Sequence, residues 1–210
     1  MKYYTYVDSP IGKLLLRSDG DSLISLYMEL EDIDYTPAMF RPLHAEQGRL
    51  GINLEAAVPP TARASSNAKM LSKVLVNERM DESLPVFKKT ISQLSEYFFE
   101  GRKNFELPLE MEGTAFQKSV WTELLSIPYG TVRSYGEMAR LLGNPAASRA
   151  VGLANGRNPI SIVVPCHRVI GSNGSLTGYG GGVNRKKFLL NLEYKVCRNS
   201  MFELSSLGEH

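Results

Sequence analysis

The chain has 210 residues, a length that fits one large domain or two small ones. Its 43% hydrophobic and 22% charged residues are ordinary for a soluble globular protein. Residues 1–8 turn polar too soon for a secretory signal segment and no uninterrupted apolar stretch is long enough to cross a bilayer, so we expect no membrane association.

The few cysteines and histidines argue against two further classes of protein. Cys166 and Cys197 are too few for a disulfide framework, and they predict a reducing, intracellular compartment. The three histidines do not combine with them in the spacing of a closed zinc site. Zinc, nucleotide and flavin motifs are also missing, so we expect no metal and no cofactor.

The net charge of +2 is divided unevenly along the chain. Residues 1–115 carry 13 Lys and Arg against 17 Asp and Glu, whereas residues 116–210 carry 11 against 5. The basic C-terminal half suggests a polyanionic partner, although charge runs are usually just solvated faces.

Strand-forming residues dominate the start of the chain. They occupy residues 3–7, 14–16 and 23–27, separated by turn signals, and predict antiparallel strands. From residue 29 to about 82 the pattern favours neither helix nor strand. Apolar residues recur at helical spacing over residues 84–99 and predict a helix.

Two capping boxes predict helix starts in the second half. A polar, proline-containing passage over residues 104–113 is predicted to link two domains. Thr114 and Gln117 then have the form of a capping box, and Ser134 and Glu137 form another that opens a short helix.

The next stretch has the layout of a helix-turn-helix. Asn144 is a good N-cap before Pro145, and it introduces a helix of small residues over 146–154. Such a helix, with Arg149 as its one long cation, can approach a nucleic-acid groove closely. The alternative is an ordinary helical hairpin inside a core.

Residues 162–169 hold the most reactive combination in the chain. The apolar residues 162–164 predict a buried strand that Pro165 ends, with Cys166 at the point where the strand leaves the sheet. A thiol beside His167 and Arg168 could have a lowered pKa, which would make it a better nucleophile. The alternative is a small buried core cysteine.

The C-terminal part combines a glycine-rich loop with a basic helix. The loop over residues 177–182 lacks the ending of a phosphate loop, and it either folds over a ligand or connects two elements flexibly. Asn184 is predicted to cap a basic helix over residues 185–192 that ends at Glu193, with Phe188, Leu189 and Leu192 packed on the core. Residues from 195 onward look like a tail.

These motifs together resemble the O6-alkylguanine-DNA alkyltransferases. The resemblance covers residues 116–193 and rests on Pro-Cys-His-Arg-Val at 165–169, Ser134-Tyr135, Asn158-Pro159, Gly178-Tyr179 and residues 189–193. It implies an α/β N-terminal domain (antiparallel sheet plus helix, ribonuclease-H-like) over 1–110. A mostly α helix-turn-helix domain, winged-helix-like, follows over 111–195, with a tail over 196–210.

The resemblance implies a single-turnover methylated-DNA–protein-cysteine methyltransferase. Such a protein flips the damaged guanine out of double-stranded DNA, which it binds through the minor groove, and transfers the O6-alkyl group irreversibly to a cysteine. It would also act on O4-alkylthymine in some cases. A monomer in the cytoplasm, associated with the nucleoid, or in the nucleus of a eukaryote, is expected.

The resemblance also implies a role for each matching residue. Cys166 would accept the alkyl group, His167 would take its proton through a water, and Glu193 would orient that histidine. Tyr135 would donate to the base and help to rotate it out, Arg149 would fill its place, and Asn158 would hold the turns beside the thiol. The expected DNA-binding set is Tyr135, Asn144, Ala147, Ser148, Arg149 and Gly152. The expected base pocket is Tyr135, Val169, Tyr179 and Gly180, where Gly180 replaces a serine of some members.

Two other functions remain open. A DNA-binding regulator or lesion sensor could use Cys166 as a reactive thiol, but it would have no need of Tyr135, Asn158 and Glu193 at these places. A cysteine hydrolase would need an oxyanion hole, and it gives no reason for Arg149 on a helix of small residues.

Overall fold

A computed structural model describes residues 1–28, 78–176 and 179–206, with side chains up to Arg198. The N-terminal part is a four-stranded sheet in the order β3-β2-β1-β4. Its strands are β1 (Lys2–Val7), β2 (Leu14–Ser18), β3 (Leu23–Met28) and β4 (Glu78–Met80). The predicted antiparallel pairing of β1 with β2 and of β2 with β3 is confirmed, and β4 adds a short parallel edge.

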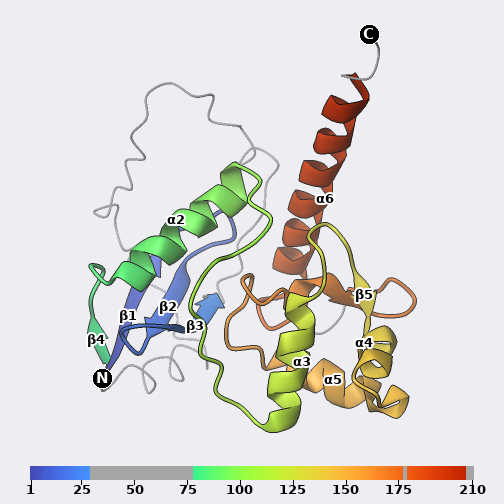
Figure 1. The fold of residues 1–210 in the computed structure, drawn as a ribbon, viewed down its shortest axis with the longest axis horizontal. Coiled ribbons are helices and arrows are strands. Elements are labelled where there is room, and N and C mark those ends of the chain that lie inside the picture. The colour runs from blue at the N-terminus through green and yellow to red at the C-terminus, as the bar shows by residue number, and fades with distance from the viewer. Residues whose placement is uncertain (29–77, 177–178, 207–210) are drawn as a thin grey trace.

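The helix predicted over residues 84–99 is confirmed as α2 (Pro85–Phe99), and it lies across this sheet (Figure 1). Its buried face carries Phe87, Leu94 and Tyr97, which join the leucines of β2 and β3 in the core. The helix ends where Gly101 takes a φ of 75°, a left-handed conformation that glycine adopts without steric cost. The sheet and α2 make up the expected α/β N-terminal part.

The edge of β3 bonds to two later segments of the chain. The Leu23 N–H donates to the carbonyl of Pro108, and the Glu110 N–H donates back to Leu23. Residues 104–113, predicted as a linker, therefore run beside β3 without forming a long strand. Further along β3, the Leu26 N–H donates to Pro159 in the C-terminal half.

The C-terminal half is mostly helical and includes the predicted helix-turn-helix. Its elements are α3 (Ala115–Leu125), β5 (Arg133–Ser134), α4 (Tyr135–Leu141), η2 (Pro145–Ala147), α5 (Ser148–Gly156), η3 (Cys166–Arg168), β6 (Val169–Ile170) and α6 (Val183–Ser206). Both predicted capping boxes are confirmed, at Thr114 and at Ser134. Asn144 stands at the predicted N-cap position with Pro145 next, but the helix that they begin is the 3₁₀ helix η2, and the Asn144 side chain makes no capping bond.

The strand predicted over residues 162–164 is wrong, although these residues are buried. Ile162 has a φ of 71°, which no strand residue adopts. The Val164 N–H donates to Ile160 and the Cys166 N–H to Val164, so the bonds are those of consecutive tight turns. Cys166 therefore begins a 3₁₀ helix, and the strand β6 that follows it pairs with β5 in parallel.

The last helix is longer than the sequence indicates. Helix α6 does not end at Glu193 but continues to Ser206, and it projects beyond the rest of the C-terminal half (Figure 1). The predicted packing of Leu189 in the core, with Phe188 and Leu192 against it, is confirmed. The division of the chain at residues 110 and 195 stays a prediction.

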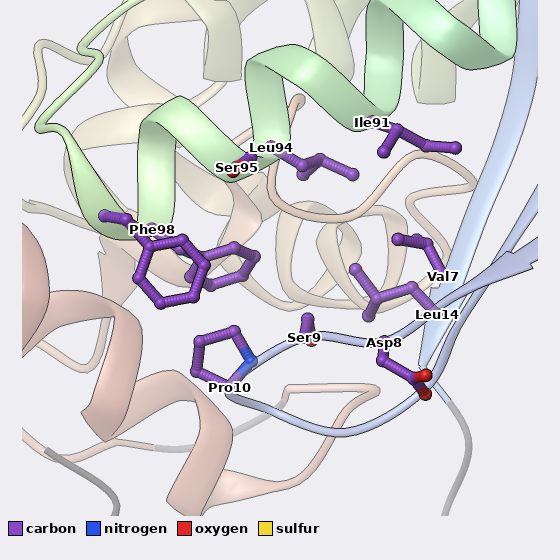
Figure 2. Close-up of a pocket in the computed structure, with 10 residues that line it drawn as sticks. Val7, Asp8, Ser9, Pro10, Leu14, Ile91, Leu94, Ser95 and Phe98 are labelled. Atoms are coloured by element: carbon purple, nitrogen blue, oxygen red, sulfur yellow. The ribbon is translucent and has the colours of Figure 1, made fainter. Parts of the chain in front are cut away.

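A small apolar cavity lies between α2 and the turn that joins β1 to β2 (Figure 2). Its volume is about 80 Å³, and it is lined by Val7, Asp8, Ser9, Pro10, Leu14, Ile91, Leu94, Ser95, Phe98 and Phe99. All of these residues belong to the N-terminal half, so the cavity is separate from Cys166. In the described part of the chain, no helix is long and apolar enough to span a membrane.

Candidate active site around Cys166

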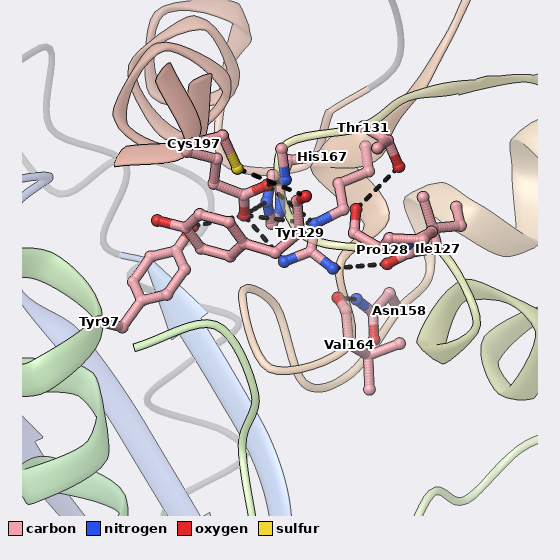
Figure 3. Close-up of polar contacts among 12 residues, drawn as sticks. Tyr97, Ile127, Pro128, Tyr129, Thr131, Asn158, Val164, His167 and Cys197 are labelled. Atoms are coloured by element: carbon pink, nitrogen blue, oxygen red, sulfur yellow. Dashed lines mark hydrogen bonds and ion pairs between the residues drawn. The ribbon is translucent and has the colours of Figure 1, made fainter. Parts of the chain in front are cut away.

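Helix η3 places three reactive side chains in succession inside the protein. Cys166 is 3% exposed, His167 is fully buried and Arg168 is 6% exposed. Asn158 fixes the turns that lead to them, because its side-chain amide donates to the Val164 carbonyl at 2.8 Å and its oxygen accepts from the Ile160 N–H at 3.0 Å (Figure 3). The buried backbone that leads to Cys166 is thus fixed by the Asn158 side chain.

Burial raises the pKa of the Cys166 thiol, which corrects the prediction of a lowered pKa. A hydrogen bond with Asn158 and the positive charge of Lys186 oppose this rise but do not overcome it. The side chains of His167 and Arg168, next in sequence, bind Glu193 instead. The thiol is therefore protonated near neutral pH and needs a base before it can attack.

Glu193 forms the centre of a buried polar network (Figure 3). Its Oε1 atom lies 2.8 Å from His167 Nε2, and Arg168 donates to both carboxylate oxygens at 2.9 to 3.2 Å. The Gly130 N–H donates to Oε2 at 2.9 Å, and the Tyr97 hydroxyl donates to Oε1 at 2.8 Å. Burial raises the pKa of Glu193, but the bonds from His167 and Arg168 outweigh it and hold that pKa at about 2.

His167 is arranged as a neutral base. Burial lowers the pKa of its imidazole, and the charges of Arg168 and Lys186 lower it further, against the opposite pull of Glu193. With Nε2 directed at Glu193, Nδ1 is buried without a hydrogen-bond partner among the described residues. That nitrogen is free to take a proton.

Three polar side chains, from α4, α5 and α6, lie near Cys166. Tyr135, the first residue of α4, is half-buried, and Lys186 Nζ lies 5.9 Å from the centre of its ring. Lys186 is fully buried and donates to the Val169 carbonyl at 2.6 Å. The buried Asn155 donates to the carbonyl of Cys166 at 3.3 Å. These side chains form one polar wall beside Cys166.

The glycine-rich loop lies against β3 and the end of α5. Tyr179 is buried, with its hydroxyl 3.8 Å from Met28 Sδ on β3. A Cβ placed on Gly180 would lie 3.6 Å from the carbonyl of Gly156, so the loop lies against the end of α5. Gly178, the first residue of the matching pair, lies outside the described residues.

The expected DNA-binding residues lie on the surface of the helix-turn-helix, apart from the buried network. Arg149 and Asn144 are exposed, and Ala147 and Ser148 are partly exposed between them. A Cβ on Gly152 would lie 3.7 Å from the Tyr135 ring, so this glycine is where α5 meets α4. The surface and the thiol are connected through Tyr135.

Sequence reasoning missed several residues of the network. Arg168 is followed by the apolar Val169 and Ile170, a signal that could have marked it as a buried cation, whereas Lys186 stands between Arg185 and Lys187 and gives no such signal. Asn155 was not singled out, and Tyr97 was interpreted only as part of the helix over residues 84–99. No pattern in the sequence connects Tyr97 with Glu193, because 96 positions separate them.

Comparison with known proteins agrees with this arrangement over most of the chain. Residues 2–111 match the ribonuclease-like domain of 6-O-methylguanine DNA methyltransferase, and residues 115–195 match its DNA-binding domain. Relatives named methylated-DNA–protein-cysteine methyltransferase include one from Mycobacterium tuberculosis, 59% identical over 92% of this chain and 93% of its own length. Another, from Methanosarcina acetivorans, is 42% identical over 91% of this chain and 97% of its own length.

A solved structure supports the same assignment. The crystal structure of Mycobacterium tuberculosis OGT in complex with DNA is similar with a TM-score of 0.69 and 39% identity, covering 92% of this chain and 94% of that one. The predicted fold class, an α/β N-terminal domain followed by a mostly helical domain, is confirmed. The chain belongs to the 6-O-methylguanine DNA methyltransferase family.

Proposed function

We propose that the chain repairs DNA by moving the alkyl group of O6-alkylguanine irreversibly to the sulfur of Cys166. A new S–C bond forms as the C–O6 bond breaks, the thiol gives up its proton, and guanine is restored with one proton gained. The observation that carries the proposal is a buried, protonated thiol next to a neutral His167 whose Nε2 is fixed by Glu193. This is the arrangement of nucleophile, base and orienting carboxylate.

His167 would accept the thiol proton at Nδ1 through a water. The Glu193 carboxylate, with its pKa held at about 2, stays ionised and stabilises the imidazolium that forms. Because the imidazolium would be buried, it needs this charge close by. The thiolate then attacks the alkyl carbon, and its negative charge passes to O6 as the S–C bond forms and the C–O6 bond breaks.

Tyr135 would donate to the leaving guanine. Burial raises the pKa of its hydroxyl, so the proton stays on the oxygen and is available for a hydrogen bond. Val169, Tyr179 and Gly180 would complete the base pocket, with Gly180 offering only its backbone N–H. A bond to O6 that strengthens as charge develops there lowers the barrier to transfer.

The surface residues would bind double-stranded DNA through the minor groove. Arg149 would enter the space left by the extruded guanine, and the small residues of η2 and α5 would let the helix come close to the groove. Base extrusion costs a few kcal/mol, less for a mispaired lesion. We also propose a monomer that works in the cytoplasm near the DNA.

The test is whether lesion DNA is restored. Duplex DNA with one O6-methylguanine is incubated with increasing amounts of protein, and the nucleosides are then analysed for guanine and O6-methylguanine. We expect one lesion to be repaired per protein molecule and no turnover afterwards. Binding of the lesion without any restored guanine would refute the proposal and would favour the regulator or sensor.

A further inference from the structure

We propose that Tyr97 is a positioning residue for the alkyl transfer, supplied by the N-terminal domain to the Cys166 site. Its hydroxyl would hold the Glu193 carboxylate in place and take up part of its negative charge, and so set the basicity of His167. The inference rests on the proposed function, because it concerns the base of that reaction.

The geometry of Tyr97 is that of a dedicated donor. It lies on α2, far in sequence from the alkyl acceptor Cys166, and its side chain is fully buried. The hydroxyl reaches Glu193 Oε1 at 2.8 Å, which places a neutral O–H donor on the same oxygen that His167 Nε2 contacts at 2.8 Å (Figure 3). Burial and the nearby Glu193 charge raise the pKa of Tyr97 well above its ordinary value, so the hydroxyl keeps its proton and donates.

The ring of Tyr97 is fixed by its neighbours. Phe98, Phe105 and Tyr129 lie with their ring centres 5.3, 5.5 and 5.9 Å from it. A ring held on three sides leaves the hydroxyl only a narrow range of positions. It can therefore keep Glu193 Oε1 in the orientation that His167 requires.

Charged and titratable groups face this pair from several elements of the described chain. Tyr97 approaches Glu193 from α2, Tyr129 from the loop after α3, and His167 and Arg168 from η3. Lys186, on α6, also acts on His167 through its charge. In this group the Tyr97 hydroxyl is the neutral side-chain donor to Glu193, and its removal changes no formal charge.

The expected effect of removing the hydroxyl has a definite sign. Without the Tyr97 bond, Oε1 holds more of the negative charge and attracts the His167 proton more strongly, so the pKa of His167 rises. The neutral imidazole is then formed only at higher pH. In a plot of transfer rate against pH, the rising limb at low pH therefore shifts to higher pH. Looser placement of Glu193 also lowers the rate at its plateau.

The experiment compares Tyr97→Phe with Tyr129→Phe and the wild type. Tyr129 is the matched control, since it is a buried neighbour whose hydroxyl has no hydrogen-bond partner among the described residues. Single-turnover methyl transfer at saturating lesion DNA is measured from about pH 5 to 9, a range that spans the ordinary pKa of histidine. For Tyr97→Phe we expect a plateau about tenfold lower, in the range of lost positioning contacts, and a limb moved to higher pH; Tyr129→Phe should retain both.

A second measurement separates this inference from the proposed function. The imidazole of His167 is followed by ¹⁵N NMR against pH in DNA-free protein, where Tyr97→Phe should raise its pKa and Tyr129→Phe should not. A wild type that transfers no methyl would overturn the proposed function, yet the NMR titration would still report on Tyr97. An unchanged titration and an unchanged rate profile in Tyr97→Phe, even with lower thermal stability, would reduce Tyr97 to a structural residue.

Discussion

At the scale of single residues, the Glu193 carboxylate connects the base to the rest of the protein. It is fully buried and accepts bonds from an imidazole, a guanidinium, a backbone N–H and a phenol. Arg168 is held in turn by the carbonyl of Ile127, to which it donates at 2.7 Å. Removing either charge leaves the other one buried and unpaired, which costs far more than an exposed ion pair.

The substitution Glu193→Gln tests this cost. We expect it to lower the free energy of unfolding by about 3–5 kcal/mol, because the buried Arg168 loses its counterion. Urea unfolding measures the change. Glu123→Gln is the control, since the ion pair of Glu123 with Arg133 is about 27–29% exposed and its loss should cost about 1 kcal/mol or less. Equal losses in both variants would contradict a buried charge network.

Arg149 should matter for repair and not for folding. It is exposed on α5, so Arg149→Ala should change stability by less than about 0.5 kcal/mol. The rate of methyl transfer from duplex DNA should fall at least about tenfold. Without Arg149 in the space left by the guanine, nothing from this side chain offsets the few kcal/mol that base extrusion costs. Arg198→Ala, an exposed arginine on α6, is the control for a general loss of positive charge. A similar fall in both variants would argue against a specific role.

At the scale of elements, the turn after α3 supports the site through one glycine. Gly130 has a φ of 74° and donates its N–H to Glu193. A Cβ placed there would lie 2.5 Å from Cys197 Sγ on α6. The turn thus needs glycine both for its backbone conformation and for the close approach of α6.

Gly130 and Gly143 have nearly equal φ angles, so comparing their substitutions separates the cost of the left-handed conformation from the cost of the contact with Cys197. Gly143 has a φ of 73°, and no described atom lies within 4 Å of the position that a Cβ would take, so Gly143→Ala should cost only about 1–2 kcal/mol of left-handed strain. Gly130→Ala should cost more, and Cys197→Ala in the same chain should recover part of the difference. Thermal unfolding of the three variants is the measurement. Equal losses for Gly130→Ala and Gly143→Ala would show that the contact with Cys197 has no effect.

Local signals in the sequence predicted elements well where local chemistry determines them. The capping boxes at Thr114 and Ser134 and the helix over residues 84–99 were predicted because the donors and apolar faces are close in sequence. The strand over 162–164 was wrong because buried β-branched residues also occur in tight turns, as Ile162 does here. The predicted helix end at Glu193 was wrong, because this glutamate is a buried residue within α6, which continues to Ser206.

The site was predictable only in part for a similar reason. Cys166 and His167 are adjacent in sequence, and their reactivity can be inferred from residue type. Tyr97 and Lys186 reach the site only through tertiary packing, and the raised pKa of the thiol follows from burial, which a dipeptide does not reveal.

At the scale of the whole molecule, the two domains are joined at the acceptor site. Backbone bonds connect Leu26 on β3 with Pro159 and Ser161. The buried Arg185 guanidinium on α6 donates to the carbonyl of Ile11 in the N-terminal domain at 2.7 Å. The N-terminal domain therefore contacts the turns before Cys166 and the start of α6 after it, and stability of the whole chain is coupled to ionisation at the site.

This coupling predicts acid sensitivity. Burial lowers the pKa of His167 from its ordinary 6.5, so the stability from keeping it neutral is present above pH 6.5 and is lost as the pH falls below that value. The pKa of Glu193 is lowered from 4.5 to about 2. Its ionised form therefore adds stability above pH 4.5, and this stability is lost as the pH falls from 4.5 to about 2. The melting temperature should fall below pH 6.5, and His167→Gln should flatten the first part of the fall. Parallel curves for both proteins would contradict the assignment.

The most direct test of the central claim locates the methyl group on the protein. The wild type, Cys166→Ser and Cys197→Ser are each incubated with duplex DNA holding one O6-methylguanine, and intact mass and peptide mass spectra are recorded. The account predicts a gain of one methyl in the wild type and in Cys197→Ser, carried by the peptide with Cys166, and no gain in Cys166→Ser. A methyl group on any other residue, or a gain that persists in Cys166→Ser, would contradict it.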